Sequence, residues 1–317
     1  MRKQNLGTVK FSTVVYAGLL AWSAAASAQE PRSISGESVR PAAGSEIWAS
    51  TDSDGTDVVK VLGKALLNFE GREKYAGIAI EHAKFNPATG ENHEAERIYL
   101  DLADHLGADW RWKARIGTDG KTLLGNAEFR KADWSQSVFV EREIVETEQG
   151  LARRIFYTFA GISTDVLLND ANTIALTAGV QEFSGKNERL HLRGKYVHVV
   201  RTDIGLSAQL DARYYHSTEP GEFDYFSPKD FVRLLPLIQT RRFSNSGWMY
   251  LAGAGFGAQH SSGGGWQLAK FGQLRLESPR SASDLDVFAE AIYTNDSISG
   301  GTNYDYLMAR AGATFRF

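Results

Sequence analysis

Two adjacent histidine–serine pairs are the residues in this sequence whose types most directly suggest catalysis. His216-Ser217 and His260-Ser261 each place a candidate general base beside a candidate nucleophile. No residue that would orient either histidine is apparent, and the histidines show no H-E-x-x-H spacing of the kind that binds catalytic zinc. We therefore expect no catalytic residue, and an enzyme acting on lipid or polysaccharide is kept as the least favoured function.

A group of aspartates is the second candidate for chemistry. Asp52, Asp54 and Asp57 bring oxygen ligands close together in the sequence, which would suit a calcium ion. The stretch lacks the rest of a calcium-loop pattern, so we interpret it as a solvated turn. Because the chain contains no cysteine, disulfides, thiol catalysis and thiolate metal sites are excluded. We expect neither a metal site nor a cofactor.

Charged residues that alternate with apolar ones form the third group. In the segment 108–117, Arg111, Lys113 and Arg115 alternate with aromatic and aliphatic residues. The same opposition recurs along the chain and predicts these pore-lining residues: Arg111, Lys113, Arg115, Glu128, Asp211, Arg213, Tyr215, Arg275, Glu290, Tyr306 and Arg310. Burying so many charges in a dry core would be very costly, whereas a water-filled lumen removes the cost. We expect a mixed, weakly interacting conduit. The alternatives are charges that only brace the wall through cross-strand pairs, or the outer face of a soluble sheet.

The elements that must position these residues are strands. The last stretch, Tyr304–Phe317, repeats with a period of two and ends on an aromatic residue, as the closing strand of an outer-membrane barrel does. Going back along the chain, we count sixteen such segments, beginning with Ser45–Thr51 and Asp57–Phe69. The segment near Ile155–Leu168 alternates least clearly, and a helix there stays open. The predicted fold is an all-β transmembrane antiparallel barrel of about sixteen strands over residues 45–317.

The connections between the segments support this fold. With the N-terminus in the periplasm, the periplasmic turns are short, whereas most connections on the other side are longer and rich in Gly, Ser, Asn and Asp. One of the long loops carries Phe223, Tyr225, Phe226 and Pro228, and we expect it to be extracellular. Its aromatic rings could stack on sugars or fold inward as a plug; a locally packed loop is slightly favoured.

The N-terminus indicates export. Basic residues precede an apolar run from Phe11 to Trp22, and Ala26-Ser27-Ala28 resembles a cleavage site, so residues 1–28 are predicted to be a secretory signal peptide. Residues 29–44 are interpreted as a periplasmic lead-in. Cleavage would change the formal charge from −3 to −6, and a net negative charge does not indicate binding to nucleic acid. We expect a protein of the Gram-negative outer membrane, with membrane lipid and the β-barrel assembly machinery as partners.

Three stretches carry a resemblance to a known family. They are Thr51–Gly55, Gln181–Arg189 and Glu222–Pro228, the last containing Tyr-Phe-Ser-Pro. Together with the closing strand they resemble the C-terminal barrel of exopolysaccharide-export porins, of the cellulose synthase operon protein C and poly-N-acetylglucosamine export porin type. The resemblance implies an outer-membrane pore for an exopolysaccharide. Family members carry periplasmic tetratricopeptide repeats, but no helical repeat of that period is present here. A separate periplasmic repeat protein is therefore an expected partner, and a non-transporting surface or receptor barrel is the main alternative.

Overall fold

The computed structural model describes residues 39–279, 284–295 and 305–317. The predicted signal peptide, residues 1–28, lies outside the described residues, as does most of the predicted lead-in. Sixteen strands and one short helix follow one another: β1 (Arg40–Asp52), β2 (Asp57–Gly71), β3 (Lys74–Asn86), β4 (His93–Leu106), β5 (Trp110–Thr118), β6 (Leu123–Lys131), β7 (Gln136–Ile144), α1 (Glu148–Arg153), β8 (Phe156–Asn169), β9 (Asn172–Phe183), β10 (Glu188–Arg201), β11 (Leu206–Ser217), β12 (Asp230–Phe243), β13 (Met249–Ser261), β14 (Trp266–Glu277), β15 (Leu285–Thr294) and β16 (Tyr306–Arg316).

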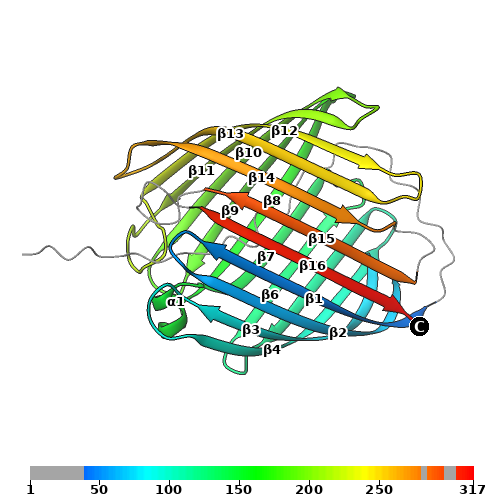
Figure 1. Ribbon diagram of the computed structural model, residues 1–317, viewed down its shortest axis with the longest axis horizontal. Coiled ribbons are helices and arrows are strands. Elements are labelled where there is room, and N and C mark those ends of the chain that lie inside the picture. Colours follow the sequence, from blue (N-terminus) through cyan, green and yellow to red (C-terminus); the bar gives the residue numbers. More distant parts are fainter. Residues whose placement is uncertain (1–38, 280–283, 296–304) are drawn as a thin grey trace, which may run out of the picture.

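The strands close into one antiparallel barrel, which confirms the predicted fold. Each strand pairs with its neighbours in sequence, and β1 also pairs with β16 in an unbroken register from Ala42 opposite Arg316 to Asp52 opposite Tyr306. Figure 1 shows the first and last strands lying side by side at this seam. Because the ring is closed, its walls have no unpaired strand edge.

The period of two in the sequence decides which side chains face outward. Aliphatic residues such as Ile80, Leu100 and Ile162 are exposed on the outside, while charged and aromatic residues between them are partly or fully buried on the inside. An apolar exterior around a polar interior is the surface division of a membrane-spanning barrel. Among the described residues, no helix is both long enough and apolar enough to cross a membrane.

Two boundaries differ from the sequence-based expectation. β1 begins at Arg40 and not at Ser45, because Ala42 already pairs with Arg316 and packs against Leu66 and Phe69. Residues 40–44 are therefore barrel wall and not lead-in. On β2, the register shifts between Leu66 and Asn68. This bulge turns Phe69 to the inside, although strict alternation predicts that it shares the outer face with Leu67.

The connections are unequal at the two ends of the barrel. At one end the turns are short, such as residues 72–73 and 170–171. At the other end lie the two long connections among the described residues, 145–155 between β7 and β8 and 218–229 between β11 and β12. The sequence left a helix near Ile155–Leu168 as an alternative, but this segment forms strand β8. The short helix α1 lies just before β8. We call residues 145–155 the inner loop and residues 218–229 the aromatic loop.

Candidate functional site

The two histidine–serine pairs do not form catalytic dyads. Consecutive strand residues point to opposite faces of a sheet, so each serine faces away from its histidine. His216 Nδ1 lies 2.9 Å from Asp230 Oδ1, whereas the buried Ser217 accepts a hydrogen bond from Arg189 Nε at 3.2 Å. The aspartate group forms a turn, because Asp52 Oδ1 accepts the backbone N–H groups of Asp54 and Thr56.

Ion pairs connect the predicted pore-lining charges on the inner wall between β1 and β6. Arg115 Nη2 lies 2.7 Å from Asp101 on β4 and 3.5 Å from Glu46 on β1. Lys113 is directly opposite Glu128 on β6 and pairs with Glu73 at 2.9 Å. Because β1 and β5 are not neighbours in the barrel, the contact between Arg115 and Glu46 crosses part of the interior.

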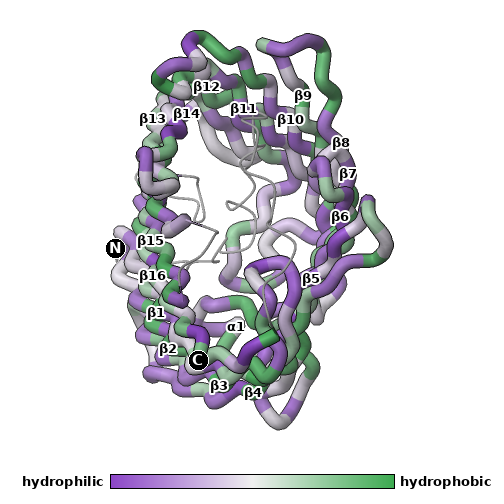
Figure 2. The backbone as a smooth tube through the Cα atoms, turned by 90° about the vertical axis from the view of Figure 1, so that its right-hand side faces the viewer, coloured by the Kyte–Doolittle hydropathy of each residue, from purple (hydrophilic) through white to green (hydrophobic). Residues whose placement is uncertain are grey.

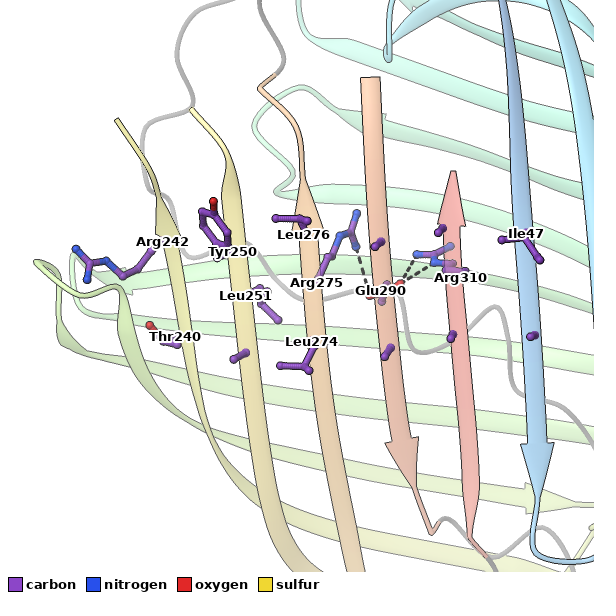
Figure 3. A pocket seen from close by; sticks show the side chains of 16 residues that line it. Ile47, Thr240, Arg242, Tyr250, Leu251, Leu274, Arg275, Leu276, Glu290 and Arg310 are labelled. Carbon is purple, nitrogen blue, oxygen red and sulfur yellow. Dashed lines mark hydrogen bonds and ion pairs between the residues drawn. The ribbon is translucent and has the colours of Figure 1, made fainter. Parts of the chain in front are cut away.

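A second set of predicted residues meets on the wall formed by β14 to β16. Glu290 accepts Arg310 Nε at 2.7 Å and lies 3.7 Å from Arg275, which also pairs with Glu277. Figure 3 shows the Glu290 side chain between the two arginines. The alternative in which charges brace the wall therefore describes this group, and its role as pore lining stays a prediction.

The remaining predicted residues are placed differently from one another. Asp211 and Arg213 lie on β11, where Asp211 pairs with arginines on both neighbouring strands. Arg111 donates to the backbone carbonyls of Ala108 and Trp110 at the turn, close to the short-turn end of the barrel. Tyr215 and Tyr306 are only 1 % and 3 % exposed, so neither ring is presented to water.

Aromatic residues explain why these tyrosines are buried. Tyr215 stacks on Phe231 with ring centroids 4.8 Å apart and meets Phe226 of the aromatic loop edge-on at 6.5 Å. A single hydrophobic cluster joins this group to Tyr306, to residues of opposite barrel walls and to both long loops. The wall residues are Tyr157, Phe159, Phe183, Ile292 and Met308, and the loop residues are Val145, Ile155 and Tyr225. The cluster therefore extends across the interior and does not follow one wall.

The inner loop is the part of the site that alternation did not reveal. It runs inside the ring of strands, where α1 is visible in Figure 2. Glu146 Oε1 lies 2.5 Å from Lys60 Nζ on β2, and the two side chains are 2 % and 11 % exposed. Lys60 also lies over the rings of Trp48 and Phe85. A lysine on a far wall thus holds the loop that follows β7.

The aromatic loop fastens α1 from the other side. Thr147 is the N-cap of α1, where its hydroxyl accepts the N–H of Gly150 at 3.0 Å and donates to Asp224 Oδ1 at 2.6 Å. Asp224 Oδ2 accepts the N–H of Gln149 at 2.8 Å. The Asp224 carboxylate therefore accepts hydrogen bonds from both the N-cap hydroxyl of Thr147 and the Gln149 N–H, which has no partner within the helix.

The aromatic loop also contacts a third connection, residues 184–187. We call the contacts among the inner loop, the aromatic loop and residues 184–187 the loop interlock. Glu222 accepts the backbone N–H groups of Lys186 and Asn187, and Asn187 Nδ2 donates to the Tyr225 hydroxyl at 3.0 Å. Tyr225 stacks on Phe183 with centroids 4.2 Å apart. The loop aromatics Tyr225 and Phe226 are buried, so they do not offer their faces to a sugar; the loop is packed by its own side chains and its neighbours.

We expect acid to strengthen the loop interlock through Asp224. Burial raises the pKa of Asp224 above its usual value, although the hydrogen bonds from Thr147 and Gln149 act in the opposite direction. A raised pKa means that the docked loop binds the proton more tightly than the undocked loop. Docking should therefore gain stability as pH falls through the raised pKa, and the gain should be complete below about 3.9.

The measurement is the open probability of single channels between pH 7 and pH 4. The wild type should close progressively on acidification. Asp224→Asn carries no charge at any pH, so it should be more closed than the wild type at pH 7 and respond less to acid. Asp203→Asn, in an exposed turn at the other end, is the control. An identical acid response in Asp224→Asn and the wild type would contradict the role of Asp224.

Comparison with known proteins places the chain by its fold. No family model matches the chain, and no curated protein sequence is similar to it. A solved structure described as a bacterial polysaccharide outer membrane secretin superposes with a TM-score of 0.61 at 14 % identity, covering 87 % of this chain and 98 % of that one. A variant of OccD1 (OprD) gives a TM-score of 0.44 at 9 % identity over 89 % and 96 % of the two chains. OccD3 (OpdP) from Pseudomonas aeruginosa gives 0.43 at 7 % identity over 89 % and 92 %.

The likeness to the secretin concerns the architecture. The superposition covers most of both chains, so they share the closed-barrel fold of an outer-membrane protein. The finer resemblance to the cellulose synthase operon protein C type rests on short sequence stretches and stays a prediction. The chain therefore has a porin-like outer-membrane barrel fold.

Proposed function

We propose that this protein is an outer-membrane pore that takes part in the export of an exopolysaccharide. The observation that carries the proposal is the closed barrel itself, with aliphatic residues outside and a charged inner wall. The fold of a polysaccharide secretin, matched over 87 % of the chain, supports the same class of cargo. Membrane lipid, the barrel assembly machinery and a separate periplasmic repeat protein are the partners that such a pore would need.

The loop interlock gives the proposed pore a closed resting state. The inner loop reaches from β7 to Lys60 on β2, and the aromatic loop covers it. A polymer leaving the cell would have to displace both loops at the end with the long connections. We therefore propose that export is gated by loop opening.

Planar-bilayer recording tests the pore directly. Purified protein should insert and show small, infrequent openings in 1 M KCl, because the closed state predominates. In cells that make the polymer, removal of the barrel should trap polymer in the periplasm, and expression of the wild-type protein should restore its release. Normal release without the barrel would refute the export function.

The closed interlock also favours a second candidate, a surface or receptor barrel that transports nothing. Such a barrel would pass no current even after its loops are removed. The loop variants treated in the Discussion therefore separate the two functions, because a transporting barrel should conduct once the interlock is broken.

A further inference from the structure

The hairpin that joins β2 to β3 extends farther at the short-turn end than the pairing of β2 with β1. The pairing between β1 and β2 ends at Arg40 opposite Phe69, whereas β2 and β3 stay paired as far as Gly71 opposite Lys74. The two turn residues that follow, 72 and 73, therefore lie beyond the last pair of β1 and β2. We call these two residues the strap. Figure 2 views the barrel from this end.

Two irregularities bend the hairpin just before the strap. The register between β2 and β3 shifts between Leu66 and Asn68, and it shifts again between Phe69 and Gly71. Gly71 has a φ of 152°, a backbone conformation that residues with a side chain rarely adopt. Bulges bend a strand, and at the rims of barrels they redirect the residues that follow. The two shifts therefore turn the end of the hairpin out of the line of the wall.

Arg72 carries one side of the strap to β14 and β15. Its Nη1 lies 3.3 Å from Glu277 Oε2, and its Nη2 donates to Ser278 Oγ at 2.9 Å and lies 3.4 Å from Asp286 Oδ1. In the ring of strands, β15, β16 and β1 stand between β14 and β2. Glu277 and Asp286 are buried, whereas the outer face of the barrel is exposed. The Arg72 guanidinium therefore lies on the inner side of the ring.

Glu73 carries the other side of the strap to β5 and β6. Its carboxylate lies 2.9 Å from Lys113 Nζ and 2.5 Å from Arg130 Nη2. In the ring, β4 and β5 stand between β3 and β6. The Arg130 side chain is only 4 % exposed, so this contact also lies inside the barrel. Two adjacent residues of one turn thus connect wall segments on both sides of the hairpin, and the strap lies across part of the short-turn entrance.

Different forces hold the base of the hairpin and the strap. The base belongs to a hydrophobic cluster that contains Leu66 and Phe69. The strap is held by charged contacts, and the side chains of Arg72 and Glu73 are 24 % and 26 % exposed. Partly exposed ion pairs contribute little stability and are weakened by salt, whereas apolar packing is not screened. The strap can therefore detach while the base stays packed, and the irregular backbone at Gly71 lies between the two.

We infer that the strap is a second gate, which narrows the short-turn entrance and swings aside when a polymer enters. The inference rests on the proposed pore, but it concerns the end opposite to the loop interlock. Closure of the barrel does not need the strap, since β1 and β16 already pair along their length. A polymer that enters at the short-turn end would meet the strap first and the loop interlock second.

A cross-link that reductant can cleave tests the gate in Arg72→Gln/Glu73→Cys/Lys113→Cys. The chain has no cysteine of its own, so a bis-methanethiosulfonate reagent with a spacer as long as the lost ion pair joins these two positions alone. Single-channel steps of the full-length chain are recorded in 1 M KCl before and after reduction. Two paired strands are about 10 Å wide, roughly half the lumen of a sixteen-stranded barrel, so reduction should raise the step conductance about twofold.

Three further variants are the controls. Arg72→Gln/Glu73→Cys has a single cysteine and cannot be cross-linked within the chain, so its steps should be large both before and after reduction. Arg72→Gln/Glu73→Gln should show the same large steps without any reagent. Lys74→Gln removes the 2.8 Å ion pair with Glu70 in the same hairpin but leaves the contacts of the strap, so its steps should equal those of the wild type.

The outcomes separate the gate from the proposed pore. Larger steps after reduction of the cross-linked protein would support both. Equal steps before and after reduction, or wild-type steps in Arg72→Gln/Glu73→Gln, would refute the gate and leave the pore standing. A barrel that passes no current in any of these variants would refute the pore, and the gate with it.

Discussion

Lys60→Met should open the barrel at pH 7 and leave it largely closed at pH 5. In the wild type, Lys60 Nζ and Glu146 Oε1 are 2.5 Å apart, and both side chains are almost completely buried. Removing one partner of a buried ion pair is strongly destabilising, because the other charge remains without compensation. In Lys60→Met the buried Glu146 carboxylate can either be protonated or move into water, and the pH determines which of the two costs less free energy.

The first way is to protonate Glu146, whose pKa is already raised by burial despite the nearby lysine. A glutamate in water has a pKa of about 4.3, so holding the carboxyl protonated costs about 3 to 4 kcal/mol at pH 7 and about 1 kcal/mol at pH 5. The second way is for the inner loop to leave the interior and take Glu146 into water. The closed state of Lys60→Met can lose no more free energy than protonating Glu146 costs. Relative to the wild type, the open-to-closed ratio therefore rises by at most a few hundredfold at pH 7 and about fivefold at pH 5.

Single-channel recording at the two pH values measures this ratio. Lys60→Met/Glu146→Gln is the matched control, since it removes both charges of the pair and leaves no carboxylate at position 146. This double variant should stay closed at pH 7 as well as at pH 5. If Lys60→Met conducts like the wild type at pH 7, the ion pair does not hold the inner loop.

The barrel could be predicted from sequence because lipid outside and polar groups inside impose a period of two on most of the strands. Leu100 and Ile116 had to be apolar, and Arg115 between apolar neighbours had to face inward, whatever their exact partners. The register could not be predicted at the bulge beside Leu66, since a single inserted residue reverses the face of Phe69 without changing composition.

The candidate site was predicted less completely, for a physical reason. The inner loop is fixed by contacts with Lys60 and Asp224, which are distant in sequence, and no periodic pattern records such contacts. Tyr215 and Tyr306 were predicted to line a pore, and their burial in one cluster with residues of both long loops is a contact that alternation along a strand cannot record. The contacts of Arg72 with Glu277 and of Glu73 with Arg130 likewise join residues that are far apart in sequence.

Replacing residues 219–228 by two glycines should give the largest increase in conductance of any change considered. The replacement removes Asp224, Glu222 and Tyr225 together, so α1 loses its outer fastening and the 184–187 turn loses its partners. The barrel should still form, because the hydrogen bond from Ser217 N–H to the Lys229 carbonyl at 2.8 Å closes the hairpin outside the deleted segment. The expected result is a steady open current in place of the infrequent openings of the wild type.

Two controls show whether the deletion acts by opening the pore or by preventing assembly of the barrel. Asp224→Ala removes only the link to α1, so its conductance should lie between those of the wild type and the deletion. Assembly is checked by the difference in gel mobility between heated and unheated protein; loss of that difference would show that the aromatic loop is needed for folding and not for closure. If the barrel assembles and the current is still that of the wild type, the aromatic loop does not close the pore.

Combining the deletion with Lys60→Met tests whether both loops form one obstruction. The aromatic loop lies against α1, and the inner loop that contains α1 is held by Lys60, so the two changes act on the same segment. Effects on a shared element are not additive. Once the deletion has freed the inner loop, losing Lys60 should add little current, whereas two independent gates would give a combined increase equal to the product of the separate ones.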